Sequence, residues 1–292
     1  MRPATAVPSG DQRPMTLELL AEKKRSGVPI VMVTAYDFPT AHVIEESGMV
    51  DLVLAGDTGA EMVLGYHATT PVSLDDMLVM TAAVRRGLRT PLLIGDLPFG
   101  SYESSDEQAV HTAQRLVKEG GADLVKLERA GASRSRVRAI VQAGVPVMGH
   151  LGLTPQTETA LGGRRVQGRN AAKAAELLAD ARALVQAGCF AIVLEAVPAP
   201  VASTVTARLP IPTIGIGAGA GTDGQVLVWH DLLGLYERRP RFAKAYAQLR
   251  TNISQALISY ADEVRSRSFP ASEHSYKIDD RELDKFLAEL DE

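Results

Sequence analysis

Short apolar segments recur along the chain and alternate with segments of helical spacing. Most are apolar at consecutive positions and rich in Val and Ile, which is typical of parallel strands covered on both faces. Within the helical segment 105–120, Ser105 and Gln108 predict a capping box at the start of the helix. Gly120 or Gly121 predicts its end. The eight apolar segments are Ile30–Val33, Leu52–Ala55, Leu92–Ile94, Leu124–Leu127, Val145–Met148, Phe190–Leu194, Thr213–Ile216 and Val226–Trp229.

Eight strands alternating with helices predict an α/β fold, a single (β/α)₈ TIM barrel that begins with an N-terminal helix. Closing the sheet removes both edges, and eight strands fill the interior with side chains. We expect the barrel over residues 15–266. Its last two strands begin at residues 213 and 226, which leaves room only for a short turn of helix between them. Residues 59–72 and 151–169 lack helical spacing and are candidate lids.

Both ends of the chain are expected to lie outside the barrel. Residues 1–14 predict a mobile tail without the apolar centre of a signal peptide. Residues 241–265 predict a long helix, and residues 267–292 a linker and a C-terminal helical extension. In this extension Leu283, Phe286, Leu287 and Leu290 form an amphipathic stripe, typical of a solvated or oligomer-contacting helix. We assign no function to residues 276–292.

The composition excludes several classes of partner. Thirty-one basic against thirty-five acidic residues give a net charge of −4, so no broad basic surface is available for nucleic acid or an anionic membrane. No stretch approaches the roughly 18 consecutive apolar residues of a membrane-spanning helix. Cys189, the only cysteine, lies in an apolar run, which predicts packing in the core and a reducing, cytoplasmic location.

Polar residues follow nearly every apolar segment. In a barrel the C-terminal ends of the strands share one rim, where active sites are built, so these side chains are expected to meet. They are Asp37, Asp57, Asp96, Lys126 with Glu128, His150 and Glu195, followed by Gly215–Gly219. No long apolar helix follows the glycines, which argues against a dinucleotide site and favours a tight turn or close backbone approach to a ligand.

Several carboxylates at one rim repel each other unless a cation neutralises them. Oxygen ligands with few His and no suitable Cys favour a hard ion, and Mg²⁺ is our first choice. Asp57 and Asp96 are the predicted ligands, with Glu128 third. The alternative for Asp57 or Asp96 taken alone is that it caps the following helix.

Lys126 and His150 are the basic groups predicted at this rim. Lys126 stands two residues before Glu128 on one strand, so both side chains face the same way. It either anchors a substrate carboxylate or forms an ion pair with Glu128 or Asp96. His150 is predicted to be a hydrogen-bonding neighbour in preference to a metal ligand or a core histidine.

Glu195 is the predicted general base. It ends an apolar strand and is followed by Ala-Val-Pro, and apolar neighbours favour proton acceptance near neutral pH. The alternative is a rim acid paired with an arginine such as Arg164 or Arg169.

Together these motifs resemble the ketopantoate hydroxymethyltransferase family from about residue 16 to residue 274. The segment 150–156 and the set of acids with Lys126 are the most specific features. One departure is Thr58-Gly59-Ala60-Glu61, where the family usually has Ser-Leu-Gly-Met, and it affects the loop and its folate contacts. The matching segments are Thr34–Asp37, Gly56–Thr58, Asp96–Phe99, Val125–Glu128, Gly149–Gln156, Leu194–Pro198 and Gly215–Gly219.

The resemblance implies roles for the same residues. Mg²⁺ would associate with Asp57, Asp96 and Glu128, and a 2-oxo acid would be held by the metal, the Asp57-Thr58 segment, Asp96 and Lys126. Glu195 would be the proton acceptor, and 5,10-methylenetetrahydrofolate the second substrate. The family also implies a large cytoplasmic homo-oligomer, decameric in many members.

The implied reaction transfers a hydroxymethyl group to 3-methyl-2-oxobutanoate through a Mg-stabilised enolate, giving 2-dehydropantoate for pantothenate biosynthesis. One alternative is a Mg-dependent lyase or mutase of the phosphoenolpyruvate mutase and isocitrate lyase type. Isocitrate lyases place a catalytic cysteine near a strand end, whereas Cys189 stands at the wrong end of its strand. The other alternative is a non-catalytic protein that keeps the barrel and binds the oxo acid without turnover.

Overall fold

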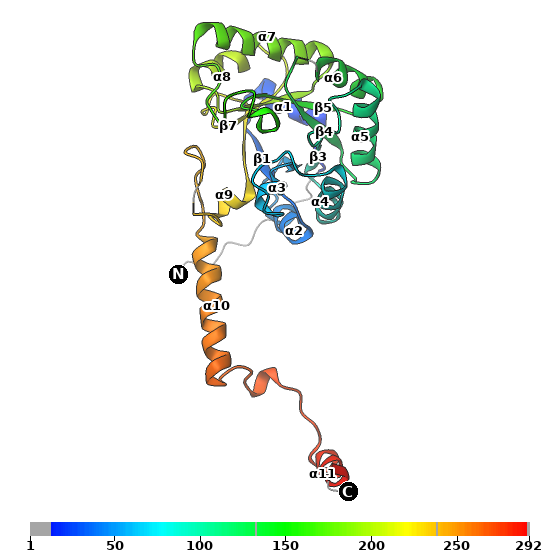
Figure 1. Ribbon diagram of the computed structural model, residues 1–292, viewed down its shortest axis with the longest axis vertical. Coiled ribbons are helices and arrows are strands. Elements are labelled where there is room, and N and C mark those ends of the chain that lie inside the picture. The colour runs from blue at the N-terminus through cyan, green and yellow to red at the C-terminus, as the bar shows by residue number, and fades with distance from the viewer. Residues whose placement is uncertain (1–12, 132, 238, 291–292) are drawn as a thin grey trace. The chain divides into compact units, whose positions relative to one another are not determined.

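Eight parallel strands form a closed barrel in a computed structural model that describes residues 13–131, 133–237 and 239–290 (Figure 1). Each strand pairs with the next, and the last pairs with the first. The predicted (β/α)₈ fold is therefore confirmed. The strands are β1 (Ile30–Thr34), β2 (Leu52–Ala55), β3 (Leu92–Asp96), β4 (Leu124–Glu128), β5 (Val147–Gly152), β6 (Ala191–Glu195), β7 (Thr213–Ile216) and β8 (Gly224–Leu227).

Helices precede, connect and follow the strands, and those between the strands surround the barrel in Figure 1. The predicted N-terminal helix is present as α1. The elements are α1 (Leu17–Ser26), α2 (Phe38–Ser47), α3 (Gly59–Met62), α4 (Leu74–Gly87), α5 (Asp106–Lys118), α6 (Ser133–Gln142), η1 (Pro155–Thr157), α7 (Ala171–Ala187), α8 (Ala199–Thr206), α9 (Trp229–Leu233), α10 (Leu249–Ser266), η2 (Ser272–His274) and α11 (Asp280–Leu290).

The strand side chains divide into two layers because successive residues face opposite sides. Met32, Ile94 and Met148 belong to a buried cluster that also includes Leu20 of α1. The alternate residues pack against the helices, and Cys189 is buried in that layer, as expected. A core filled in this way leaves the C-terminal ends of the strands as the place for polar chemistry.

The structure corrects two expectations around the last strands. β8 begins at Gly224 and ends at Leu227, so it starts two residues before the predicted segment, and Trp229 begins α9. Gly224 pairs with Ile30 of β1, and a Cβ on it would lie 2.5 Å from the Ile30 carbonyl oxygen, so only glycine fits there. Residues 217–223 form turns and bends, not the short turn of helix that we expected.

The predicted capping box of α5 forms only in part. Ser105 accepts a hydrogen bond from the Gln108 backbone N–H, but the Gln108 side chain bonds Ser104 in place of the Ser105 backbone. A complete capping box occurs at α4, between Ser73 and Asp76. Ser104 offers both a backbone N–H and a hydroxyl, which explains the preference of Gln108.

The predicted helix over residues 241–265 begins only at Leu249. Phe242 lies over Gly217, where a Cβ would come within 2.7 Å of its ring, so this stretch packs on the barrel in an irregular conformation. Contacts divide the described chain into a barrel unit (residues 13–232 and 239–244) and a C-terminal unit (residues 233–237 and 245–290). Residues 1–12 of the predicted mobile tail lie outside the described residues.

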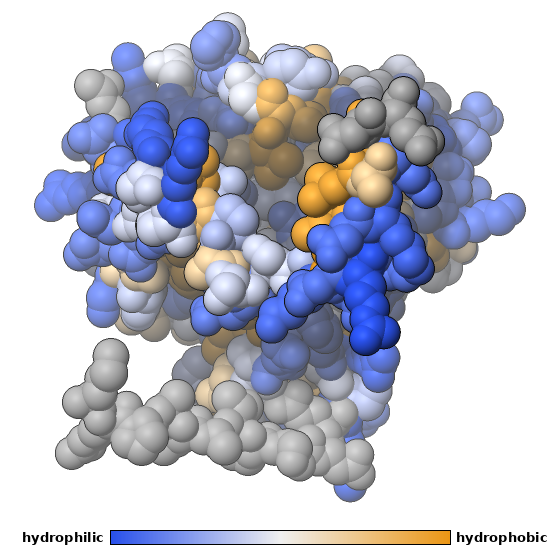
Figure 2. All heavy atoms as spheres, turned by 90° about the horizontal axis from the view of Figure 1, so that it is seen from below, coloured by the Kyte–Doolittle hydropathy of each residue, from blue (hydrophilic) through white to orange (hydrophobic). Residues whose placement is uncertain are grey.

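The C-terminal unit exposes apolar side chains on both of its α-helices. Neither α10 nor α11 contains a buried residue. Figure 2 shows apolar groups set among charged ones on the face viewed from below. Over the ranges that the structure describes, no helix is long and apolar enough to span a bilayer. The exposed apolar residues of the two helices are Ile253, Leu257, Ile258, Tyr260, Val264, Leu283, Phe286, Leu287 and Leu290.

Candidate active site

The C-terminal ends of the strands enclose a cavity of about 50 Å³, which we call the inner cavity. Strand register brings its charged groups together: β3 pairs with β4 so that Asp96 faces Lys126, and β4 pairs with β5 so that Glu128 faces His150. All the predicted site residues line it, namely Asp57, Thr58, Asp96, Lys126, Glu128, His150 and Glu195. The expected convergence is therefore what the structure shows for these seven residues.

Lys126 and Asp96 form a buried ion pair. Lys126 Nζ lies 2.8 Å from Asp96 Oδ1, so the ion-pair alternative considered for Lys126 describes this structure. Burial alone would lower the pKa of Lys126, but the Asp96, Asp57 and Glu128 carboxylates hold it above its usual value. Burial raises the pKa of Asp96 to about 7, against the opposing effect of Lys126. Lys126 is therefore a permanent cation in a site crowded with acids.

Asp57 joins this pair from the end of β2. Its backbone N–H donates to Asp96 Oδ2 at 3.1 Å, and its side chain is buried. Neither acid caps a helix, since Thr58 precedes α3 and Ser105 caps α5. Asp37 does cap α2 and is exposed, so it has no place in the inner cavity. The capping alternative thus holds for Asp37 alone among the predicted acids.

His150 lies between two carboxylates. Its Nδ1 is 3.3 Å from Glu128 Oε1 and its Nε2 is 3.2 Å from Glu195 Oε2. Burial and Lys126 lower the pKa of His150, but Glu128 and Glu195 outweigh them and raise it to about 9. Burial raises the pKa of Glu128, and His150 opposes that effect. A protonated His150 can therefore hold both carboxylates in place at neutral pH.

Glu195 is the most exposed of these charged side chains, with 17% of its side chain accessible. It faces His150 and not Arg164, so its surroundings are more polar than its sequence neighbours suggested. Arg164 instead bonds Glu61 at 2.7 Å and Glu158 at 2.8 Å. These contacts tie the two candidate lid segments, 59–72 and 151–169, to each other. Glu61 belongs to the segment that departs from the family pattern.

Gln156 is a buried residue that contacts two of these acids and that was not predicted from the sequence. Its side-chain Nε2 donates to Asp57 Oδ2 at 3.0 Å, and its backbone N–H donates to Glu128 Oε2 at 3.1 Å. Tyr102 donates its hydroxyl to Gln156 Oε1 at 2.6 Å. The sequence did hold a signal for Gln156, because this residue ends the specific segment that begins at His150. An amide side chain taken alone, however, does not indicate a functional role.

Two other features complete the inner cavity. The Tyr36 and Thr58 hydroxyls lie 2.7 Å apart, so Thr58 offers the cavity a hydrogen-bonding hydroxyl. The remaining lining is largely apolar, and it includes Leu54, Val193, Ile216, Val226 and Val228. An acid with a small branched hydrocarbon part suits such a cavity.

The charges of this site fit a divalent cation. Four carboxyl groups, those of Asp57, Asp96, Glu128 and Glu195, face one ammonium and one imidazole, so the acids outnumber the bases. Within the described part of the chain, no three His, Cys, Asp or Glu side chains are arranged to hold a metal ion. Mg²⁺ usually takes only one or two protein carboxylates, so Asp57 and Asp96 are a sufficient donor set. Glu128 faces Gln156 and His150.

A family model described as ketopantoate hydroxymethyltransferase matches residues 14–272. The chain belongs to this family. It is 55% identical to 3-methyl-2-oxobutanoate hydroxymethyltransferase of Moorella thermoacetica, over 90% of this chain and 98% of that protein. It is 51% identical to 3-methyl-2-oxobutanoate hydroxymethyltransferase 1, mitochondrial, of Arabidopsis thaliana, over 97% of this chain and 84% of that protein. Membership makes the chain a transferase enzyme, as the resemblance implied.

Solved structures of other enzymes share the fold. A phosphonopyruvate hydrolase aligns with a TM-score of 0.59 at 13% identity, covering 94% of this chain and 95% of its own. A phosphoenolpyruvate phosphomutase of Streptomyces platensis subsp. rosaceus aligns with a TM-score of 0.57 at 14% identity, covering 92% of this chain and 97% of its own. At these identities the likeness extends to the barrel alone, so the lyase or mutase alternative has support only at the level of the fold.

Proposed function

We propose that the chain transfers a hydroxymethyl group from 5,10-methylenetetrahydrofolate to 3-methyl-2-oxobutanoate, giving 2-dehydropantoate in pantothenate biosynthesis. Relatives at 50–55% identity bear the name of this enzyme. The observation that carries the proposal is the inner cavity, in which Glu195 faces His150 beside the Lys126 and Asp96 pair. This cavity offers a base, a cation and an apolar wall to one small acid.

The oxo acid would be held by both polar and apolar groups. Lys126 Nζ would anchor its carboxylate, the Thr58 hydroxyl would donate to an oxygen, and the apolar wall would take its isopropyl group. Asp57 and Asp96 would hold Mg²⁺, with Glu128, which lies between Gln156 and His150, as the third proposed ligand. Mg²⁺, when bound, acts as a Lewis acid that stabilises negative charge on the substrate.

Glu195 would remove the C3 proton of the oxo acid. Its Oε2 faces His150, so Oε1 is the oxygen left to accept the proton. The electron pair of the broken C–H bond delocalises into the 2-oxo group, and C3 of the enolate then attacks the methylene carbon of the folate iminium. Water adds its hydroxyl to the methylene carbon as the bond from that carbon to folate N5 breaks, and the other water proton passes to N5. The proton that Glu195 removed passes to N10, so that 2-dehydropantoate and tetrahydrofolate are released. His150 keeps Glu195 oriented throughout.

The remaining expectations belong to the same proposal. We propose a cytoplasmic homo-oligomer, decameric as in many members of the family, that binds the oxo acid and folate and neither nucleic acid nor membrane. The net charge of −4 supports the last point.

The decisive experiment follows exchange of the C3 proton of 3-methyl-2-oxobutanoate with deuterated water, with Mg²⁺ and without folate. The wild-type protein should exchange this proton, and Glu195→Gln should lose about 10²-fold or more of the rate, because an amide accepts no proton. NMR measures both rates. Undiminished exchange in Glu195→Gln would remove Glu195 as the base. Thermal stabilisation by the oxo acid without exchange or turnover would favour the non-catalytic alternative.

A further inference from the structure

The inner cavity is too small for the folate of the proposed reaction. It measures about 50 Å³, whereas pockets for ligands of that size usually measure about 300–1,000 Å³. Only the one-carbon unit needs to reach the oxo acid. Most of the co-substrate must therefore lie outside the inner cavity, against a neighbouring surface of the rim.

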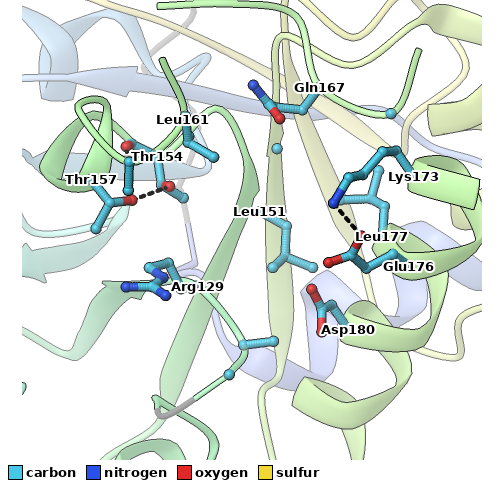
Figure 3. Close-up of a pocket in the computed structure, with 15 residues that line it drawn as sticks. Arg129, Leu151, Thr154, Thr157, Leu161, Gln167, Lys173, Glu176, Leu177 and Asp180 are labelled. Carbon is cyan, nitrogen blue, oxygen red and sulfur yellow. Dashed lines mark hydrogen bonds and ion pairs between the residues drawn. The ribbon is translucent and has the colours of Figure 1, made fainter. Parts of the chain in front are cut away.

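A second cavity of about 340 Å³ opens beside the inner one, and we call it the outer cavity. Figure 3 shows it between the loops that follow β4 and β5 and the helix α7. Thr154 and Thr157 stand on its wall, with their hydroxyls 2.7 Å apart. The residues between them face the other way, since Pro155 lines the inner cavity and Gln156 bonds Asp57. A single turn thus separates the two cavities.

The wall of the outer cavity is anchored to the strands that carry the catalytic groups. The Arg129 N–H donates to the His150 carbonyl oxygen at 2.9 Å, and the Leu153 N–H donates to the Glu195 carbonyl oxygen at the same distance. These bonds fix the loops after β4 and β5 on the rim. A ligand in the outer cavity therefore has a defined position relative to the inner one.

The lining combines a carboxylate with apolar surface. Figure 3 shows Leu151 between a wall with Arg129 and Thr157 and a wall with Glu176 and Asp180. Burial and Glu176 raise the pKa of the Asp180 carboxyl, and the positive charges of Arg134, Arg129 and Lys173 oppose that effect. Glu176 is engaged by Lys173 at 2.7 Å, so Asp180 is the carboxylate set against the leucines.

This chemistry matches one part of the co-substrate. The pteridine ring is flat and largely apolar on its faces, and its 2-amino-4-oxo edge presents two adjacent N–H donors. A carboxylate accepts two such donors in parallel, which gives a strong, directional pair of hydrogen bonds. The benzoyl-glutamate part has no such pair of adjacent N–H donors, so it offers Asp180 no matching hydrogen bonds.

We propose that the outer cavity binds the pteridine ring of the folate, with its faces against Leu151 and Leu177 and its 2-amino-4-oxo edge on Asp180. This inference rests on the proposed function and assigns the second substrate a place. The methylene carbon, still attached to the folate, then extends past the Thr154–Thr157 turn to reach the oxo acid.

The test separates folate binding from chemistry in the inner cavity. Asp180→Asn should raise both the KM for 5,10-methylenetetrahydrofolate and the Kd of tetrahydrofolate, measured by calorimetry, about tenfold or more. The KM for the oxo acid and the folate-independent exchange of its C3 proton should stay at wild-type values. Leu161→Trp, which fills the cavity, should produce the same selective loss. Glu176→Gln is the matched control, with changes below about threefold expected.

Unchanged folate constants in both Asp180→Asn and Leu161→Trp would overturn the inference, while wild-type exchange would leave the proposed function standing. Equal losses in Asp180→Asn and Glu176→Gln would also overturn it, because they indicate a general charge effect. A wild-type protein that neither exchanges nor turns over the oxo acid would instead remove the proposed function itself.

Discussion

Each charged residue of the inner cavity depends on a neighbour of opposite charge. A buried charge is costly to keep unless it is paired, so removal of one partner affects the other. Lys126 balances Asp96, and His150 balances both Glu128 and Glu195. Gln156 helps to position these groups, since it bonds both Asp57 and Glu128.

Replacing Gln156 by Leu should weaken the metal site. The change removes the donor to Asp57 and the acceptor for the Tyr102 hydroxyl, both of them buried. We expect the Mg²⁺ concentration for half-maximal activity to rise about 10–100-fold, as is usual when a group that orients a ligand is lost. The rise in Tm that Mg²⁺ produces should shrink accordingly, and calorimetry with increasing Mg²⁺ measures this without substrate.

Tyr102→Phe is the control for this prediction, since it removes one hydrogen bond to Gln156 and leaves Asp57 its donor. Its Mg²⁺ dependence should stay within about threefold of wild type, with a cost in stability of about 1–3 kcal/mol for the unpaired amide oxygen. An unchanged Mg²⁺ dependence in Gln156→Leu would show that Gln156 has only a structural role.

At the scale of elements, the pairing of β5 with β6 fixes the backbone of Glu195, the proposed general base. Gly152 pairs with Glu195, has a φ of +93°, and a Cβ on it would lie 2.2 Å from the Glu195 carbonyl oxygen. Gly152→Ala should therefore displace the end of β6. Gly100 offers a matched control, since its φ is +86° but nothing lies within 4 Å of an added Cβ.

Gly100→Ala should cost only the backbone strain, roughly 1 kcal/mol of unfolding free energy. Gly152→Ala should cost about 1–3 kcal/mol more because of the clash, and should also lower kcat. Urea unfolding of both variants measures the difference. Equal costs at the two positions would mean that the β5 and β6 ends adjust freely and that Gly152 does not hold Glu195.

The elements that could be predicted from the sequence are those fixed by local pattern. Strands buried on both faces are apolar at consecutive positions, and the polar residue after each one marks the rim, so the barrel and its charged residues could be found. The packing of Phe242 on Gly217 joins distant segments, and no local pattern indicates it. The contacts of Gln156 likewise depend on how one loop turns back over two strands.

At the scale of the whole molecule, α10 exposes large apolar side chains. It has 18 residues, none of them buried in a single chain, although its sequence carries several large apolar side chains. An isolated helix of this length is only marginally stable in water, and exposed apolar surface of this kind marks contact sites. These features agree with the proposed homo-oligomer, in which further copies of the chain would cover α10.

Leu257→Glu should therefore reduce the size of the assembly. Leu257 is 62% exposed on α10, and a carboxylate at an interface between chains would lose its hydration without a partner. Light scattering after size exclusion should give the wild type about ten times the 31.2 kDa of one chain and the variant a smaller assembly. Gln255→Glu adds the same charge at an exposed polar position of α10 and should leave the mass unchanged.

Circular dichroism should show the barrel intact in both variants. A wild-type mass of one chain would contradict the proposed oligomer, and an unchanged mass in Leu257→Glu would place the contact elsewhere on the molecule.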